Sequence, residues 1–415
     1  MKKHFLILSA VILLTAFTGF SCANVTSPNG FTSRNLGVKA ENESATDSDA
    51  FTFEEKDGDI VITGLKYTTE NEIVIPSAIN GLPVREIKEY AFKNCEITSL
   101  TVPKSVEKIG YGVLSECAAL SRLTLPFTGE RHLTEWSAND YNFGYIFGSY
   151  AFVGGEKTMQ FYHKTYSDEV ELVDYYIPTA LKEVKITGIN NTLIPYSAFY
   201  NCSGLEKITL GKDVLSIGEF AFSGVNADIL FEEPKIEIVG EHAFEDYKGV
   251  SLAIPTSVKE IKKKGYSACV NVKSFDIPDS VEKIDIYAFS YCYDLESVKI
   301  SKNIRKLSAE TFYFCISLKS VVLPENLILI DEGAFDCCKA LQEINLPPNL
   351  SRINANAFKS CEKLKAARFE DANGWRYYSI LTSGEGFSFY DISVPATAAR
   401  YLTDTFKDFI WEKAS

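Results

Sequence analysis

The chain has 415 residues, of which 46% are hydrophobic, and a formal net charge of −13 at pH 7. This apolar fraction is enough for a continuous core, and the acidic balance without a basic patch argues against nucleic acid and anionic membrane surfaces as partners. Beyond the N-terminal segment, no stretch of the sequence is long and apolar enough to cross a bilayer.

The N-terminus has the pattern of an export signal. The basic start Met-Lys-Lys-His is followed by an apolar run over residues 5–20, so residues 1–21 are predicted to be a signal peptide. The ending Gly-Phe-Ser-Cys is similar to a bacterial lipoprotein signal, which implies lipid attachment at Cys22. Cleavage after Ser21 or Ala23 is the alternative. We expect a lipid-anchored protein at the cell surface or outer membrane, with a secreted or periplasmic protein as the alternative.

Residues 22–50 are rich in Ser, Thr, Asn and Asp and contain few aliphatic residues. This composition buries too little apolar surface to offset the entropy of an ordered chain. The segment is predicted to be a flexible tether.

From residue 92 onward, an aromatic residue that usually follows alanine recurs. Where the pattern is regular the steps are 22 or 23 residues, with Leu114 and Tyr266 at the same position in weaker copies. A fixed period in this range predicts a solenoid, in which each repeat packs on its two neighbours. The predicted core anchors are Phe92, Phe199, Phe222, Phe244, Phe289, Phe312, Phe335 and Phe358.

One repeat is seen in LEKITLGKDVLSIGEFAFSG, residues 205–224. Its first apolar residues alternate as a strand requires, a Gly or Pro turn often follows, and a second apolar pair precedes the Ala-Phe. Stacked coils would pair their strands in parallel, which predicts a parallel sheet along one side of the solenoid.

A cysteine follows most anchors by three residues. A small side chain fits a buried turn, and residues in one column point in parallel, so buried free thiols are favoured over a disulfide framework. No CxxC-type metal spacing occurs, and we expect no metal and no cofactor. The column contains Cys95, Cys117, Cys202, Cys269, Cys292, Cys315, Cys338 and Cys361.

The reiterated pattern L-x-x-I-x-L-P-x-x-V-x-x-I-x-x-x-A-F-x-x-C, over about residues 60–365, resembles the BspA-like class of bacterial leucine-rich repeat surface proteins. The resemblance implies a right-handed leucine-rich repeat solenoid, here over residues 51–365, with an N-terminal β cap. It also implies a cell-surface protein that binds other proteins, with adhesion to host matrix or to other cells. It identifies no ligand, because the repeat encodes architecture.

The repeat is interrupted at about residues 127–176, which are predicted to be an insertion rich in aromatic residues. Insertions in repeat proteins often form the binding face. A local hydrophobic cluster is the alternative, and a second function hypothesis is a glycan site in which Trp136 and nearby tyrosines stack on sugar rings. The candidate ligand-binding residues here are Trp136, Tyr141, Tyr145, Tyr162 and His163.

Exposed strand positions between core residues form a second candidate surface. Thr209, Asp276, Lys299 and Asn345 would stack side by side on the sheet and contact an extended protein. A solvated sheet face is the alternative.

Residues 366–415 lie beyond the periodic region and are predicted to be a C-terminal cap. Ala399, Leu402, Phe406, Phe409 and Ile410 have helical spacing after Pro395, which predicts a terminal helix over 396–413. The cap would cover the open end of the solenoid, with Trp375 and Trp411 packed in it.

The sequence shows no catalytic motif. HExxH, a Gly-rich phosphate loop and a GxSxG elbow are all absent. A hydrolase site in the insertion, using His132 or His163, remains a third function hypothesis. The sequence therefore favours a binding protein that is not an enzyme and whose partner is an extracellular protein, with a glycan as the second choice.

Overall fold

The computed structural model describes residues 44–66, 69–132, 141–163, 169–189, 192–379, 387–388 and 391–414. The predicted signal peptide and Cys22 lie outside the described residues. None of the helices in these ranges has the length and apolar character needed to span a membrane.

The solenoid begins with a β hairpin that caps its first coil. Strands β1 (Phe51–Lys56) and β2 (Asp59–Leu65) pair antiparallel. Asp57 and Gly58 between them have φ of 54° and 87°, as a tight two-residue hairpin turn requires. The predicted tether is too long at its C-terminal end, because the backbone N–H of Thr46 donates to the Val74 carbonyl at 2.9 Å and the turn Ser48–Ala50 leads directly into β1.

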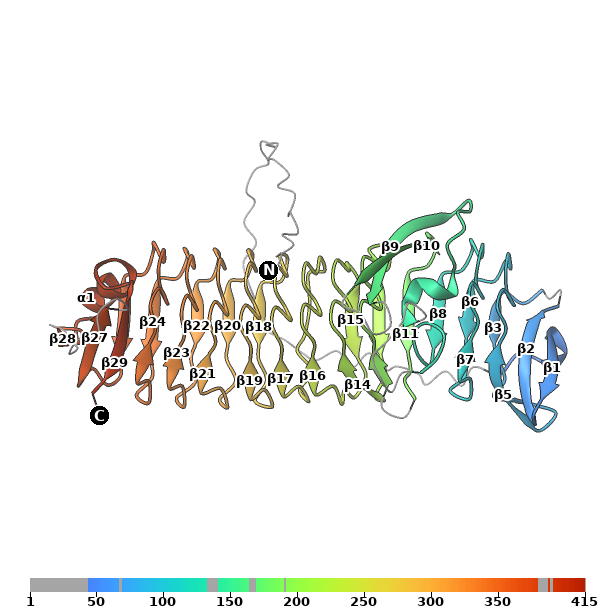
Figure 1. Ribbon diagram of the computed structural model, residues 1–415, viewed down its shortest axis with the longest axis horizontal. Coiled ribbons are helices and arrows are strands. Elements are labelled where there is room, and N and C mark those ends of the chain that lie inside the picture. The colour runs from blue at the N-terminus through green and yellow to red at the C-terminus, as the bar shows by residue number, and fades with distance from the viewer. Residues whose placement is uncertain are drawn as a thin grey trace, which may run out of the picture. The chain divides into compact units, whose positions relative to one another are not determined.

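The coils follow one another along a single axis, and their strands form two parallel ladders (Figure 1). The sequence predicted the first ladder, whereas the second is a finding of the structure. It is built from the apolar pair before each anchor, such as Ile284, which is buried. The first ladder contains β3 (Glu72–Val74), β6 (Ser99–Thr101), β8 (Arg122–Leu125), β11 (Glu183–Ile186), β13 (Lys207–Leu210), β15 (Asp228–Phe231), β18 (Ser274–Asp276), β20 (Ser297–Lys299), β22 (Ser320–Val322), β24 (Glu343–Leu346) and β26 (Ala366–Phe369). The second contains β5 (Leu82–Ile87), with β4 (Ala78–Ile79) at its edge, β7 (Lys108–Ile109), β12 (Thr192–Ile194), β14 (Val214–Ile217), β16 (Ile238–Val239), β17 (Glu260–Ile261), β19 (Lys283–Ile284), β21 (Lys306–Leu307), β23 (Leu329–Ile330) and β25 (Arg352–Ile353).

The predicted anchors form one aromatic column through the core. From Phe199 to Phe358 each ring stacks on the next, with centroids 5.0–5.5 Å apart and interplanar angles of 4–17°. The residue before the anchor is small because neighbouring coils approach closely there. The carbonyl of Thr311, which precedes the anchor Phe312, accepts from the N–H of Phe289 one coil earlier at 2.9 Å. The column confirms the predicted solenoid.

The anchor turn has an unusual backbone. Residues two before and two after the anchor lie in the left-handed region; around Phe289 these are Tyr287 and Tyr291, with φ of 59° and 60°. This conformation costs a non-glycine residue energy. It directs alternate N–H groups along the axis, so that Tyr291 donates to the Tyr313 carbonyl at 2.7 Å. Hydrogen bonds between coils therefore stabilise a strained turn in every repeat.

The cysteines of the column form hydrogen bonds to the same turn. All eight of its members are free thiols. The Sγ of Cys292 donates to the Tyr266 carbonyl at 3.2 Å, and the Sγ of Cys361 to the Phe335 carbonyl at 3.1 Å. Six of the eight thiols bind the carbonyl of the anchor one coil earlier in this way, so cysteine supplies both a small side chain and a weak donor.

The predicted insertion is shorter than residues 127–176. Phe127, Phe143 and Phe147 are buried in the core, and Phe143 lies 4.9 Å from Phe199 at the head of the aromatic column. The turn Phe143–Ile146 therefore belongs to an irregular coil, and β8 pairs directly with β11 across it. The excursion is the hairpin of β9 (Gly155–His163) and β10 (Val170–Pro178).

The C-terminal cap contains a short helix and a final strand. Helix α1 (Pro395–Arg400) has proline at its first turn, as predicted, and continues as a π-helical turn at Tyr401–Thr405. The expected helix over the rest of 396–413 is wrong, because β29 (Phe409–Lys413) pairs antiparallel with β25 and with β27 (Trp375–Ser379). Hydrogen bonding to the open edge of β25 outweighs the local helical pattern. Strand β28 (Phe387–Ser388) pairs with the outer edge of β27.

Candidate binding surfaces

Hairpin β9–β10 is attached to the anchor turns by the edge of β9. The carbonyl of Phe161 accepts hydrogen bonds from Asn142 Nδ2 at 3.1 Å and from Ser197 Oγ at 2.7 Å. The Phe161 ring contacts Tyr200 and Phe220, with centroids 4.3 and 5.4 Å apart. These contacts place β10 on the outer side of the hairpin.

Gln160 fixes the hairpin from within the core. Its side chain is fully buried, and its Oε1 accepts from the N–H of Gly144 at 2.8 Å. Its Nε2 donates to the carbonyls of Ala198 and Tyr200 at 3.0 and 3.2 Å, and lies 3.5 Å from Cys202 Sγ. One amide thereby satisfies backbone groups of two separate coils. Sequence reasoning missed Gln160, because a single glutamine in a β-rich run carries no distinguishing signal.

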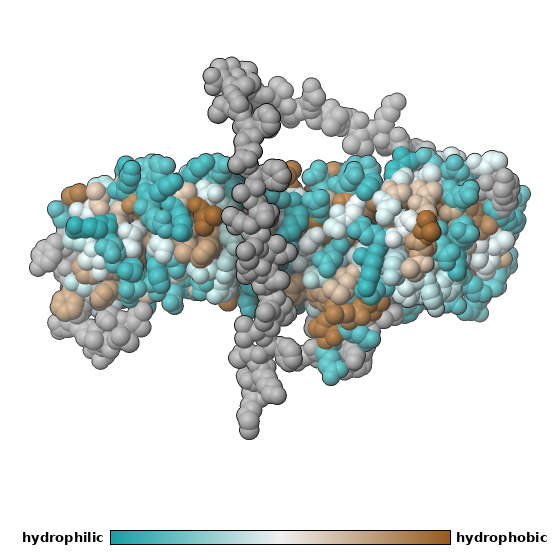
Figure 2. Space-filling model, turned by 90° about the horizontal axis from the view of Figure 1, so that it is seen from above, coloured by the Kyte–Doolittle hydropathy of each residue, from teal (hydrophilic) through white to brown (hydrophobic). Residues whose placement is uncertain are grey.

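Both strands of the hairpin expose aliphatic side chains. Met159, Val170 and Leu172 are 40%, 49% and 60% exposed. In Figure 2, hydrophobic colour covers a projection from the long side of the molecule in the region of this hairpin. Over residues 170–174, no other strand of the described chain lies along the outer edge of β10.

Among the described residues, the aromatic candidates of the predicted insertion do not form a surface on which a ligand ring could stack. Trp136 lies outside the described residues, as do the side chains of Tyr162 and His163, whose backbones belong to β9. Tyr145 packs partly buried, 5.3 Å from the Tyr111 ring in an edge-on contact. Tyr141 is half-buried.

The strand-face candidates are spread over distant coils. Thr209 is only 8% exposed and is flanked in register by Lys185 and Leu230. Asp276 and Lys299 are brought together, but they bind each other, with Nζ and Oδ1 3.1 Å apart. Each charge of this pair therefore already has a partner of opposite sign. Asn345 is exposed, next in register to Arg368, and Arg368 binds Glu343.

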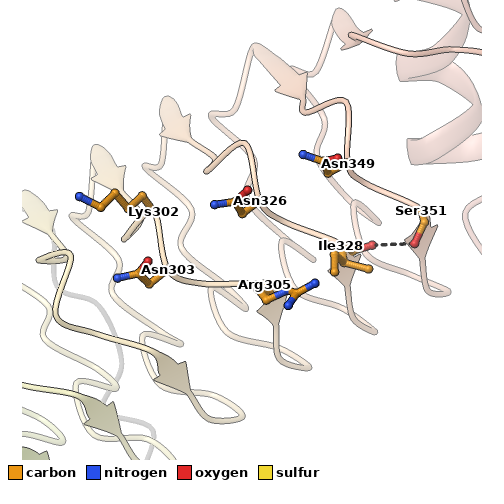
Figure 3. A pocket seen from close by; sticks show the side chains of 7 residues that line it. All are labelled: Lys302, Asn303, Arg305, Asn326, Ile328, Asn349 and Ser351. Carbon is orange, nitrogen blue, oxygen red and sulfur yellow. Dashed lines mark hydrogen bonds between the residues drawn. The ribbon is translucent and has the colours of Figure 1, made fainter.

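A groove that no sequence pattern suggested lies between the two ladders in the C-terminal half. Its volume is about 590 Å³. Figure 3 shows two rows of side chains along it, contributed by successive coils. One row contains Asn303, Asn326 and Asn349, the other Arg305, Ile328 and Ser351, and Lys302 lies at one end.

The groove is polar and carries positive charge. Lys302 Nζ lies 2.9 Å from Asp279 Oδ2, whereas the guanidinium of Arg305 has no hydrogen-bond or ion-pair partner among the described residues. No aspartate or glutamate is among the seven residues that line the groove. A repeated asparagine at a step of 23 residues was the signal that could have revealed this row.

Groups suited to metal binding or proton transfer are sparse in the described ranges. No group of three His, Cys, Asp or Glu side chains there is arranged to hold a metal ion. Partial burial lowers the pKa of His132, and His242 binds Glu245, with Nδ1 and Oε2 2.7 Å apart.

The chain was compared with protein families and with curated proteins. A family model described as BspA type Leucine rich repeat region matches in six copies, over residues 66–142, 174–285 and 259–374. The matched ranges cover more than half of the chain, and the unmatched stretch 143–173 contains β9. No curated protein matches the chain.

Several solved structures are similar to this chain. A leucine-rich repeat protein from Bacteroides ovatus is 19% identical, with 79% of this chain and 88% of that chain covered and a TM-score of 0.41. A leucine-rich cell surface protein from Faecalibacterium prausnitzii is 19% identical over 79% and 88% of the two chains, with a TM-score of 0.31. A pneumococcal vaccine antigen is 19% identical over 72% and 62%, with a TM-score of 0.29.

Proposed function

The chain belongs to the BspA-type leucine-rich repeat family, and we propose that it is an exported surface protein that binds an extracellular protein through hairpin β9–β10. The observation that carries this proposal is the outer strand of that hairpin. Over residues 170–174, and with respect to the described strands, β10 presents an open edge together with the exposed side chains of Val170 and Leu172.

An open strand edge can accept a strand from a partner. Main-chain hydrogen bonds to the added strand supply affinity, and alternate side chains supply specificity. The attachment of β9 by Gln160 and Phe161 holds the edge in a fixed orientation before binding, which lowers the entropic cost of association. The exposed aliphatic residues add apolar area of the kind that is enriched at the centre of interfaces.

Export is supported by the basic and apolar pattern of residues 1–21, and lipid anchoring by Cys22 at the end of that pattern. A protein held at the cell surface would meet matrix proteins and the surfaces of other cells. Adhesion to one of these is the biological role that we propose.

Binding of the full chain to a panel of immobilised matrix proteins and bacterial cells tests the proposal. For any ligand found, Leu172→Lys should weaken binding about tenfold or more, because a desolvated charge is unfavourable in an apolar interface. The matched control is Val322→Lys, since Val322 on β22 is 59% exposed and far along the axis from the hairpin.

Two outcomes would overturn the proposal. If Leu172→Lys and Val322→Lys bind alike, the hairpin is not the interface. If the wild-type chain binds no protein in the panel, protein recognition is not its function. Deleting residues 127–176 would be a poor test, because that deletion also removes the buried Phe127, Phe143 and Phe147 from the core.

A further inference from the structure

The polar groove of the C-terminal half has the composition of a ligand site (Figure 3). Its residues lie on the segments that connect the first ladder to the second, and it is independent of hairpin β9–β10. Solenoid packing places equivalent residues of neighbouring coils about 4.8 Å apart, so each row repeats one chemical group at a fixed spacing.

The asparagine row offers oriented amides. Asn303 Nδ2 donates to the Asp279 carbonyl at 2.7 Å, and Asn349 Nδ2 donates to the Glu325 carbonyl at 2.9 Å. These bonds fix the two amide planes and leave the Oδ1 atoms as acceptors. Asn326, between them, makes no side-chain hydrogen bond to the described part of the chain, so its amide can both donate and accept.

Arg305 gives the groove its charge. Its guanidinium is exposed and unpaired among the described residues, at a site without a lining carboxylate. The chain has a net charge of −13, and most described lysine and arginine side chains on the coils have an acidic partner, as Lys319 has in Glu296. A guanidinium binds a carboxylate through two parallel hydrogen bonds. The groove is therefore complementary to a carboxylate.

The other residues that line the groove favour a sugar chain over a peptide as its ligand. Most protein and peptide interfaces also bury large apolar or aromatic anchors in pockets, and Ile328 is the one apolar residue among those that line this groove. Amides, a serine hydroxyl and a guanidinium instead match the closely spaced hydroxyl groups of a sugar chain. We propose that the groove binds a segment of an acidic, carboxylate-bearing polysaccharide, with Arg305 on the carboxylate and Asn326 on sugar hydroxyls.

Calorimetry of the full chain with oligogalacturonate and alginate oligomers, both of which carry a carboxylate on every sugar, tests this site. The methyl ester of oligogalacturonate is the neutral control ligand. We expect binding of at least one acidic oligomer and, for oligogalacturonate, a loss of about tenfold or more on esterification, as for removal of a charged hydrogen-bonding partner.

Both test variants replace an exposed arginine, so they should fold as the wild type does. Arg305→Gln keeps a polar side chain of similar length at an exposed position and should weaken binding about tenfold or more. Arg122→Gln is the matched control, because Arg122 is an exposed arginine on β8 outside the groove, and it should bind as the wild type does. An unchanged melting temperature of Arg305→Gln would show that lost binding is not unfolding.

Three results would overturn the proposal: neither acidic oligomer binds, Arg305→Gln binds as tightly as Arg122→Gln, or polyglutamate binds as tightly as the acidic sugars. The last result would assign the groove to an acidic peptide. None of them bears on the hairpin, whose test uses other residues and other ligands.

Discussion

The thiol of Cys315 donates a hydrogen bond to the carbonyl oxygen of Phe289, one coil earlier, with Sγ and O 3.2 Å apart. The same contact recurs between Cys338 and Phe312 at 3.3 Å. A residue chosen for small size thus also ties the backbone of one coil to the next.

Replacing Cys315 with alanine should lower the free energy of unfolding by about 1–2 kcal/mol, because the sulfur leaves a small cavity and its hydrogen bond is lost. Chemical denaturation followed by circular dichroism measures this. Cys337→Ala is the control, since Cys337 is only half-buried and lies outside the column. A loss as large for Cys337→Ala as for Cys315→Ala would contradict a specific role for the column.

Three buried thiols of the column, Cys117, Cys338 and Cys361, should resist alkylation in the native protein. Burial raises the pKa of the Cys117 thiol to about 12, and it raises the pKa of Cys338 and Cys361 as well. Only the thiolate reacts, so at pH 8 these three buried thiols stay protonated and unreactive while half-buried Cys337 reacts first. Mass spectrometry after iodoacetamide treatment checks this, with the denatured protein as the fully labelled reference. Native labelling of Cys117 at the rate of Cys337 would refute it.

Burial also raises the pKa of the Cys315 thiol, and these shifts predict weakening of the fold at alkaline pH. A thiol whose folded pKa is raised stabilises the fold fully below its unfolded pKa of about 8.5 and loses that contribution as pH rises toward the folded value. The melting temperature should therefore fall above pH 9, and less steeply in Cys315→Ala than in the wild type. An equal slope in both proteins would count against the thiols as the cause.

Gln160→Leu should loosen hairpin β9–β10. The substitution removes the partner of the Gly144 N–H and of the Tyr200 carbonyl, and an unsatisfied buried group costs about 1–3 kcal/mol. Limited proteolysis should then cut between residues 155 and 178 well before the coils. Thr158→Val is the control, because neighbouring Thr158 is buried but makes only a 3.5 Å contact with the Glu156 carbonyl. Equal protease resistance of both variants would show that Gln160 does not hold the hairpin.

Trp411→Ala should expose the C-terminal end of the solenoid. Trp411 is buried, lies opposite Ile353 in the β25–β29 pair, and donates from Nε1 to the Phe406 carbonyl at 3.1 Å. Truncating a buried tryptophan costs about 3–5 kcal/mol, and an uncovered strand edge favours association. Light scattering at rising protein concentration should detect aggregation of this variant. A monodisperse, equally stable Trp411→Ala protein would mean that the cap is held elsewhere.

The repeat itself could be predicted from the amino-acid sequence. The period of Phe289, Phe312 and Phe335, the alanine before most anchors and the cysteine three residues after them were enough to predict stacked coils, the aromatic column and buried thiols. This works because each coil contacts its immediate neighbours, so one local pattern, repeated, fixes most of the packing.

The departures from the repeat could be identified only from the tertiary structure. Phe143 takes the column position that sequence left empty, because its spacing to Leu114 and Phe199 is irregular. Phe409 and Ile410 have helical spacing, yet they form a strand that covers the edge of β25. The pairing of Asp276 with Lys299, the burial of Gln160 and the groove at Arg305 arise from contacts between coils. The order of residues along one chain fixes the period, whereas only the stacking of coils in space decides which polar groups meet and which stay free.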